Sequence, residues 1–203
     1  MAVRKNQLSR MQKAVRLIAS FLDPRIYLHG IKMLNYWNYS HVQPLRRVAK
    51  GRDLAISPDA VFADPDRITI GDRVRIGSRC HIWAGPSTGR IVIGDDVLFG
   101  PEVMVTAATY RYNDGTPVTK QLMDEADIII GRDVWIGVRA VILPGTRIGD
   151  GAVIGAGSVV KGEIPPFALA VGSPARVVGS RTQVFDPPPF RHDRQHHHPA
   201  LPR

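Results

Sequence analysis

The sequence is poor in the features that mark secreted and membrane-spanning proteins. Its 203 residues contain one cysteine, Cys80, so no disulfide framework can form within the chain. No apolar run approaches the ~18 residues that a transmembrane helix needs. The first residues do not resemble a signal peptide, because Arg16 interrupts the apolar run and no small-residue cleavage site follows. We therefore expect a reducing, cytoplasmic location.

Acidic residues are scarce in the N-terminal quarter of the chain. Residues 1–52 hold eleven Lys or Arg and one acid, Asp23, a balance of +10, whereas the remainder holds 16 basic and 17 acidic residues, a balance of −1. The net charge of +9 therefore belongs to an N-terminal arm and not to the body. Basic charge without an accompanying motif is weak evidence for nucleic-acid binding, and we expect none.

The arm has the pattern of two amphipathic helices. Asp23 and Pro24 predict an N-cap and the first position of the second helix. Such an arm can pack on the body or on a neighbouring subunit, or it can make peripheral contact with anionic lipid at the inner face of the membrane. The sequence leaves these alternatives open. The apolar face of the first helix carries Leu8, Met11, Val15, Ile18 and Leu22.

The body is periodic. Two glycines stand six residues apart in each of the segments ITIGDRVRIG (68–77), IVIGDDVLFG (91–100), IIIGRDVWIG (128–137) and TRIGDGAVIG (146–155). Corresponding isoleucines are separated by 23, 37 and 18 residues, which are multiples of six once insertions are removed. A fixed period with insertions between repeats indicates a stacked solenoid. Three hexapeptides close one triangular coil, and the coils must stack to bury their shared aliphatic column.

These segments resemble the hexapeptide-repeat acyltransferases. The resemblance covers about residues 56–179 and is most specific at IGRDVWIGVRAVILPGTRIGDGAVIGAGSVV and IPPFALAVGSPARVV. It implies an all-β, left-handed parallel β-helix over residues 56–165, followed by a C-terminal extension over 166–185. It also implies a homotrimer with active sites between subunits, and acyl transfer from acetyl-CoA to a hydroxyl or amine without a metal. Within the family, the chain is most similar to enzymes that acetylate sugars of surface polysaccharides or glycolipids.

The resemblance also indicates where coenzyme A would bind. Backbone groups at Val138 and Ala156 match family positions that contact pantetheine, and their spacing of 18 residues stacks them one above the other. Arg176 matches a basic residue near the nucleotide phosphates, and its permanently charged guanidinium suits that contact. Lys161 follows the last coil and could assist. Trp135 either walls the thioester channel or lies at a subunit seam.

The repeat is interrupted by a long insertion at about residues 106–127, which in the family covers the acyl acceptor. Family members carry a histidine base near its start, and the alignment places Tyr110 there, or Thr109 if it is shifted by one residue. A phenol has an ordinary pKa of about 10 against about 6.5 for imidazole, so tyrosine is a poor default base. We expect catalytic roles for Tyr110 and Asp114. The residues expected to contact the acceptor are Trp83, Thr109, Asn113 and Glu125.

The missing histidine leaves a second function class open, namely a trimeric scaffold or regulatory protein with a decayed site. His81 is the only histidine of the repeat region and is a further candidate base, as is the carboxylate Glu102. One histidine cannot supply the three zinc ligands of a carbonic anhydrase on this fold. Residues 1–55 are expected to form the arm. The Pro-rich tail, residues 186–203, contains His192 and His196–His198 and has the composition of a disordered end. Any metal capture by its triple histidine would be incidental, and we expect no metal site.

Overall fold

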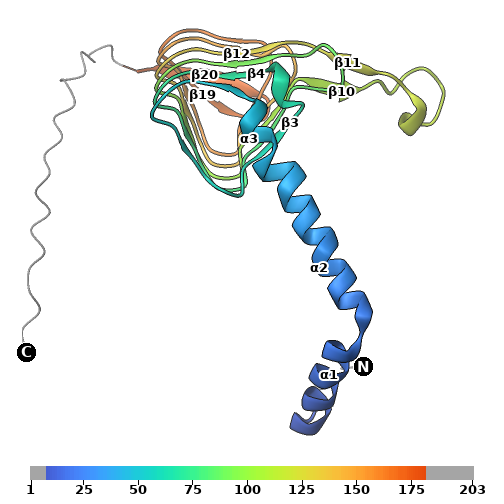
Figure 1. The fold of residues 1–203 in the computed structure, drawn as a ribbon. Coiled ribbons are helices and arrows are strands. Elements are labelled where there is room, and N and C mark those ends of the chain that lie inside the picture. The colour runs from blue at the N-terminus through green and yellow to red at the C-terminus, as the bar shows by residue number, and fades with distance from the viewer. Residues whose placement is uncertain (1–7, 182–203) are drawn as a thin grey trace, which may run out of the picture.

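The computed structural model describes residues 8–181 of the chain. A prism of stacked strands forms the body, a helical arm projects from one end of it, and a two-stranded hairpin extends from its side (Figure 1). The proline-rich tail, with His192 and His196–His198, lies outside the described residues. Among residues 8–181, no helix is both long enough and apolar enough to cross a bilayer.

The arm is helical, as its sequence pattern predicts. The Ser9 hydroxyl accepts a hydrogen bond from the backbone nitrogen of Gln12, and the Gln12 side chain accepts one from the Ser9 nitrogen. Asp23 caps the second helix and Pro24 is its first residue, which confirms the predicted start. The helical elements are α1 (Arg10–Leu22), α2 (Pro24–Trp37), a short π-helix η1 (Asn38–Val42) and α3 (Pro44–Arg47).

The body is a parallel β-helix with three faces, which confirms the predicted solenoid. The first face contains β1 (Ala49–Lys50), β4 (Ile68–Ile70), β7 (Ile91–Ile93), β12 (Ile128–Ile130), β15 (Arg147–Ile148) and β18 (Glu163–Ile164). The second contains β2 (Ala55–Ile56), β5 (Arg75–Ile76), β8 (Leu98–Phe99), β13 (Trp135–Ile136), β16 (Val153–Ile154) and β19 (Ala168–Gly172), with β20 (Ala175–Ser180) added antiparallel to β19. The third contains β3 (Val61–Ala63), β6 (His81–Trp83), β9 (Met104–Thr106), β14 (Val141–Ile142) and β17 (Val159–Val160).

The strands point apolar side chains into the prism, two from each of β4, β7 and β12 and one from most of the two-residue strands. On the second face, Ile76, Phe99, Ile136 and Ile154 are stacked in register and are all at least 97% buried. The solenoid begins at Ala49, ahead of the expected boundary at residue 56, because β1 pairs with β4 and starts the first face. The small helix α3 lies beside this first coil, where Val48 and Leu45 join the core.

The corner between the second and third faces repeats with one backbone conformation. Arg79, Glu102, Arg139 and Gly157 occupy equivalent positions in four successive coils, with φ of 56°, 60°, 59° and 66°. Because neighbouring coils approach each other closely, Gly137, just before this corner, cannot be replaced by a larger residue. A Cβ on Gly137 would lie 2.6 Å from the backbone nitrogen of Ala156, so only glycine lets these two coils stack.

The long insertion is ordered as a hairpin. Strand β10 (Ala108–Tyr110) pairs antiparallel with β11 (Met123–Glu125), and Tyr110 stands opposite Met123. Between the strands lies a 3-10 turn, η3 (Val118–Lys120); a second such turn, η2 (Pro65–Arg67), precedes β4. The insertion leaves the corner between the third and first faces, and the next coil resumes at β12.

Candidate functional site

Most residues expected to bind the coenzyme line the second face and its corner with the third. Trp135 points outward from β13, between Leu98 and Val153 of the neighbouring coils, and is 52% exposed. Val138 and Ala156 are both exposed and occupy equivalent corner positions. The Val138 carbonyl accepts a hydrogen bond of 2.8 Å from the nitrogen of Gly157, next to Ala156, so these coils stack as predicted.

Arg176 lies near the same face. It belongs to β20 and stands opposite Val171 of β19, the C-terminal strand pair of the second face. Its side chain is exposed, and one guanidinium nitrogen donates to the carbonyl of Ala175 at 3.0 Å. The structure therefore brings Arg176, Trp135 and the corner of Val138 and Ala156 to one side of the prism.

Lys161 does not join this group. It follows β17 and lies at the corner between the third and first faces, whereas Ala156 precedes the same strand. Five residues of extended chain span about 16 Å. Within one chain, the width of the third face therefore separates Lys161 from Trp135, Val138, Ala156 and Arg176.

The acceptor candidates gather at that other corner. Trp83 ends β6, and its indole nitrogen donates to Asp64 Oδ2 at 2.8 Å. Thr106 lies in register above it, at the point where the hairpin begins. Thr109 and Tyr110 follow in β10, both exposed. Tyr110 is 51% exposed, and the phenol is therefore accessible to a ligand approaching this corner.

The tip of the hairpin is fully exposed and includes Asn113 and Asp114. Asp114 Oδ1 accepts hydrogen bonds from the nitrogen and the hydroxyl of Thr116, at 2.8 and 2.6 Å. These bonds hold the pKa of Asp114 below its ordinary value. A carboxylate that is stabilised in its ionised form is a weak proton acceptor, so the geometry offers Asp114 no environment that favours general-base catalysis.

Glu125 connects the hairpin to the preceding coil. Its two carboxylate oxygens accept hydrogen bonds from the backbone nitrogens of Ser87, Thr88 and Gly89 and from the hydroxyls of Ser87 and Thr88. The backbone nitrogen of Gly89 contributes most to lowering the pKa of Glu125, to about 2. In this arrangement the carboxylate holds the loop of residues 84–90 against β11.

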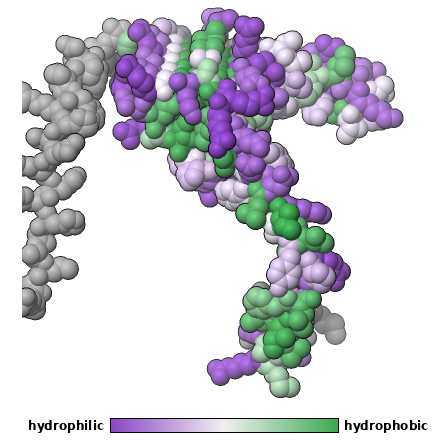
Figure 2. Space-filling model, viewed as in Figure 1, coloured by the Kyte–Doolittle hydropathy of each residue, from purple (hydrophilic) through white to green (hydrophobic). Residues whose placement is uncertain are grey.

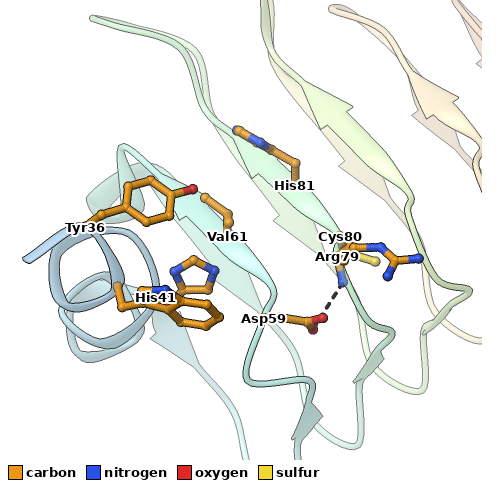
Figure 3. Close-up of a pocket in the computed structure, with 8 residues that line it drawn as sticks. Tyr36, His41, Asp59, Val61, Arg79, Cys80 and His81 are labelled. Atoms are coloured by element: carbon orange, nitrogen blue, oxygen red, sulfur yellow. Dashed lines mark hydrogen bonds between the residues drawn. The ribbon is translucent and has the colours of Figure 1, made fainter. Parts of the chain in front are cut away.

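An open pocket of about 370 Å³ lies where the arm meets the body (Figure 3). Trp37 and His41 form one wall, with ring centroids 4.6 Å apart, and Ser40 Oγ lies 2.6 Å from His41 Nδ1. His81 belongs to the strand beyond Val61 and lines the same pocket. The surroundings desolvate His81 and lower its pKa, which keeps the imidazole neutral at pH 7. The sequence singles out His81, but no pattern in it indicates the pocket wall formed by Trp37 and His41.

Glu102 lies at the corner between the second and third faces. One oxygen accepts from Arg139 Nε at 2.5 Å and the other pairs with Arg79, so three stacked coils are linked by charge. Arg139 and Arg79 together lower the pKa of Glu102. Because it is paired with two arginines, the Glu102 carboxylate is less suited to accept a proton than the neutral imidazole of His81.

The two groups of candidates therefore occupy different corners of the prism. The coenzyme group lies on the second face and its corner with the third, whereas Trp83, Thr109 and Tyr110 lie at the corner between the third and first faces. Along one coil, the third face separates these two corners by about 16 Å.

Comparisons with known proteins identify the repeat. Residues 127–162 match a family model described as bacterial transferase hexapeptide (six repeats), and residues 67–87 match the hexapeptide repeat of succinyl-transferase. The galactoside O-acetyltransferase of Escherichia coli is 32% identical over 166 residues, which are 76% of this chain and 79% of that protein. A solved structure of galactoside acetyltransferase in complex with coenzyme A superposes with a TM-score of 0.62 and 30% identity, over 77% of this chain and 81% of that one.

Another relative is considerably longer than the matched region. A protein of Mycobacterium tuberculosis named as a probable acetyltransferase is 34% identical over 162 residues. The match takes in 78% of this chain but only 53% of that protein.

Proposed function

The chain belongs to the hexapeptide-repeat acyltransferases, and from that membership we propose that it transfers an acetyl group from acetyl-CoA to a hydroxyl or amine of a sugar. The acceptor would be an intermediate of polysaccharide or glycolipid assembly, in the cytoplasm. The observation that carries the proposal is the family match over residues 127–162, because this segment contains Trp135, Val138, Ala156 and Lys161.

The coenzyme corner fits a thin thioester arm. Ala156 and Gly157 are exposed and carry almost no side chain, so a pantetheine group can approach the backbone of this coil and of the coil below, at Val138. Arg176 supplies an exposed guanidinium for the nucleotide phosphates. Trp135 offers an exposed apolar wall beside them.

The separation of the two corners supports a homotrimer. In a ring of three copies, a heterologous interface brings the second–third corner of one chain against the third–first corner of the next. Lys161, Trp83 and the hairpin would then come from the neighbouring subunit. Each of the three interfaces would contain one site.

Acyl transfer needs a proton acceptor and a group that stabilises the developing oxyanion. In the proposed reaction the acceptor oxygen or nitrogen attacks the thioester carbonyl, the C–S bond breaks, and coenzyme A leaves as a thiolate that takes up a proton. Tyr110 donates its phenol hydrogen to the oxyanion or orients the acceptor. His81 is the base, because its imidazole is neutral at pH 7 and lines an open pocket at the start of β6 on the third face.

The alternative function is a scaffold or regulatory trimer that has lost acyl transfer. The specific observation in its favour is Tyr110, which stands where the family resemblance places a histidine base. Thermal protection by coenzyme A would then be absent or would occur without turnover.

The test combines coenzyme binding with product formation. The protein is incubated with acetyl-CoA and a panel of sugars and amino sugars, free thiol is followed with a disulfide reagent, and acetylated product is identified by mass spectrometry. Ala156→Trp fills the coenzyme corner and should abolish both thermal protection and turnover, whereas Ala49→Trp, at an exposed position of the first coil, should leave both in place. Thermal protection without an acetylated product would favour the alternative.

A further inference from the structure

The arm presents a large apolar surface without a partner in this chain. Within the described part of the arm, residues 8–37, no side chain of α1 or α2 is buried. Met11 is 79% exposed, Leu22 78% and Leu34 72%. Figure 2 shows apolar surface along the arm and at its far end, well away from the body. Helices α1 and α2 therefore bury no side chain on the body, whereas the later part of the arm, η1 and α3, does contact it.

The lengths and N-caps of α1 and α2 do not by themselves explain why the arm is helical. The two helices are 13 and 14 residues long, and both have well-formed N-caps. Isolated helices of fewer than about 12–15 residues are marginal in water, because nucleation is costly. A partner that covers the apolar face would stabilise both helices.

The distribution of side chains around α1 defines that partner. At 100° per residue, Arg16, Ser20 and Lys13 occupy one side of the helix. The opposite side carries Met11, Val15, Ile18 and Leu22. Leu17 and Phe21 lie on the flank between the two sides, next to Arg10.

Helix α2 continues the pattern. Arg25, His29 and Lys32 lie close together on one side, and Ile26, Ile31 and Leu34 lie on the other. Tyr27 and Trp37 are exposed at its two ends. Aromatic residues with a polar edge are favoured at the headgroup level of a bilayer.

The charge of the arm has one sign. Residues 8–37 contain five Lys or Arg, and their one acid, Asp23, is 2.9 Å from Arg25 and so is already neutralised. A second copy of the arm is equally basic. The body of a second copy has a balance of −1, which is far less negative than an anionic lipid surface.

We propose that the arm binds an anionic lipid bilayer, with α1 and α2 lying in the plane of the interface. The apolar halves enter the boundary between headgroups and acyl chains, and the basic side chains contact lipid phosphates. The protein would thus be a peripheral membrane protein whose body projects into the aqueous phase. This inference is independent of the proposed catalytic function, because the α1 side chains changed in its test form no part of the proposed acyl-transfer site.

The test is vesicle flotation with the full chain. Vesicles of phosphatidylcholine mixed with phosphatidylglycerol should carry the protein upward, and vesicles of phosphatidylcholine alone should carry much less. Raising the salt to about 1 M, where the Debye length is about 3 Å, should weaken the binding. The triple variant Arg10→Gln/Lys13→Gln/Arg16→Gln should bind on the order of a hundredfold more weakly, at about fivefold per basic residue.

Matched variants separate this inference from its alternatives. Arg90→Gln/Lys120→Gln/Arg147→Gln removes the same charge from exposed positions of the body and should bind like the native protein. Ile18→Ser/Leu22→Ser keeps the charge and should also lose binding. Equal flotation with both lipid mixtures, or equal binding by the two triple variants, would overturn the proposal. A native protein that fails to float would also overturn the proposal. If its sedimenting mass then fell when the arm's apolar face was changed, a second copy of the chain would be the arm's partner.

Discussion

The backbone nitrogen of Gly89 lies 2.5 Å from Glu125 Oε2, and this bond ties the inserted hairpin to the loop of the preceding coil. The carboxylate accepts five hydrogen bonds in all from residues 87–89. Glu125, which the sequence analysis suggests for acceptor binding, thus has a structural role. It sets the position of the strand that pairs with Tyr110.

Glu125→Gln should loosen the hairpin, because an amide replaces one acceptor oxygen with a donor that faces backbone N–H groups. The expected result is faster hydrogen exchange in residues 85–89 and 108–125, with little change in the coils. Thr119→Ala, at another exposed position of the tip, is the control. Unchanged exchange in Glu125→Gln would show that these bonds do not hold the hairpin.

The same carboxylate predicts a pH dependence. Its pKa is lowered from 4.5 to about 2 in the folded protein, so its contribution to stability is fully present above pH 4.5. The contribution is lost as the pH falls from about 4.5 to about 2. The difference in hairpin exchange between native protein and Glu125→Gln should therefore shrink over that range. A difference that stays constant would contradict the assignment.

Gly137→Ala should destabilise the solenoid by about 1–3 kcal/mol, since overpacking of a tight contact has that cost. Its Cβ would lie 2.6 Å from the Ala156 nitrogen and would push two coils apart at the coenzyme corner. Denaturant unfolding measures the loss, and the affinity for coenzyme A should fall with it. Gly179→Ala is the matched control, because nothing lies within 4 Å of a Cβ there. Equal stability of the two variants would show that the corner can relax.

Tyr110→Phe should lower kcat by roughly tenfold to a hundredfold while leaving the KM for acetyl-CoA unchanged, since loss of one oxyanion donor costs up to about a thousandfold. Tyr112→Phe, two residues further along the exposed hairpin, should have no effect. Steady-state kinetics with a responsive sugar separates kcat from KM. A Tyr110→Phe variant with native turnover would remove this residue from the reaction.

His81→Gln should lower kcat/KM by on the order of a hundredfold to ten-thousandfold, the contribution of a general base. For the native protein, kcat/KM should rise with pH through a pKa below 6.5 and then level off, because only the neutral imidazole accepts a proton. The variant should lack that step. His29→Gln, on the exposed arm, is the control. A native pH profile in His81→Gln would place the base elsewhere.

The sequence predicts the fold well because the fold is periodic. The glycine pairs and the spacings of Ile70, Ile93, Ile130 and Ile148 reflect one geometric rule, repeated in every coil, and those isoleucines do stack in one column. The start of the first coil is placed too late because its residues, such as Ala49 and Ala55, lack the aliphatic-glycine pattern. A coil at the end of the stack is covered by α3 and Leu45 and need not follow the rule.

The site is less predictable for a physical reason. Spacing places Val138 above Ala156, since both obey the repeat. The hairpin has no period, so nothing in the sequence indicates that Glu125 faces Gly89 or that Arg111 pairs with Asp124 at 2.7 Å. The pocket beside His81 depends on how the arm meets the body, and that angle is set by the π-helix η1 and the stacked pair Trp37 and His41.

The central claim is that the coenzyme corner of one chain works with the acceptor corner of another. Subunit complementation tests it most directly. Ala156→Trp disables the first corner, and deletion of the hairpin tip, residues 112–119, disables the second. Each variant alone should be inactive. Mixed and reassembled in equal amounts, they should regain about a quarter of native activity, because a quarter of the interfaces in random trimers join two intact corners. A mixture as inactive as its components would contradict the shared site.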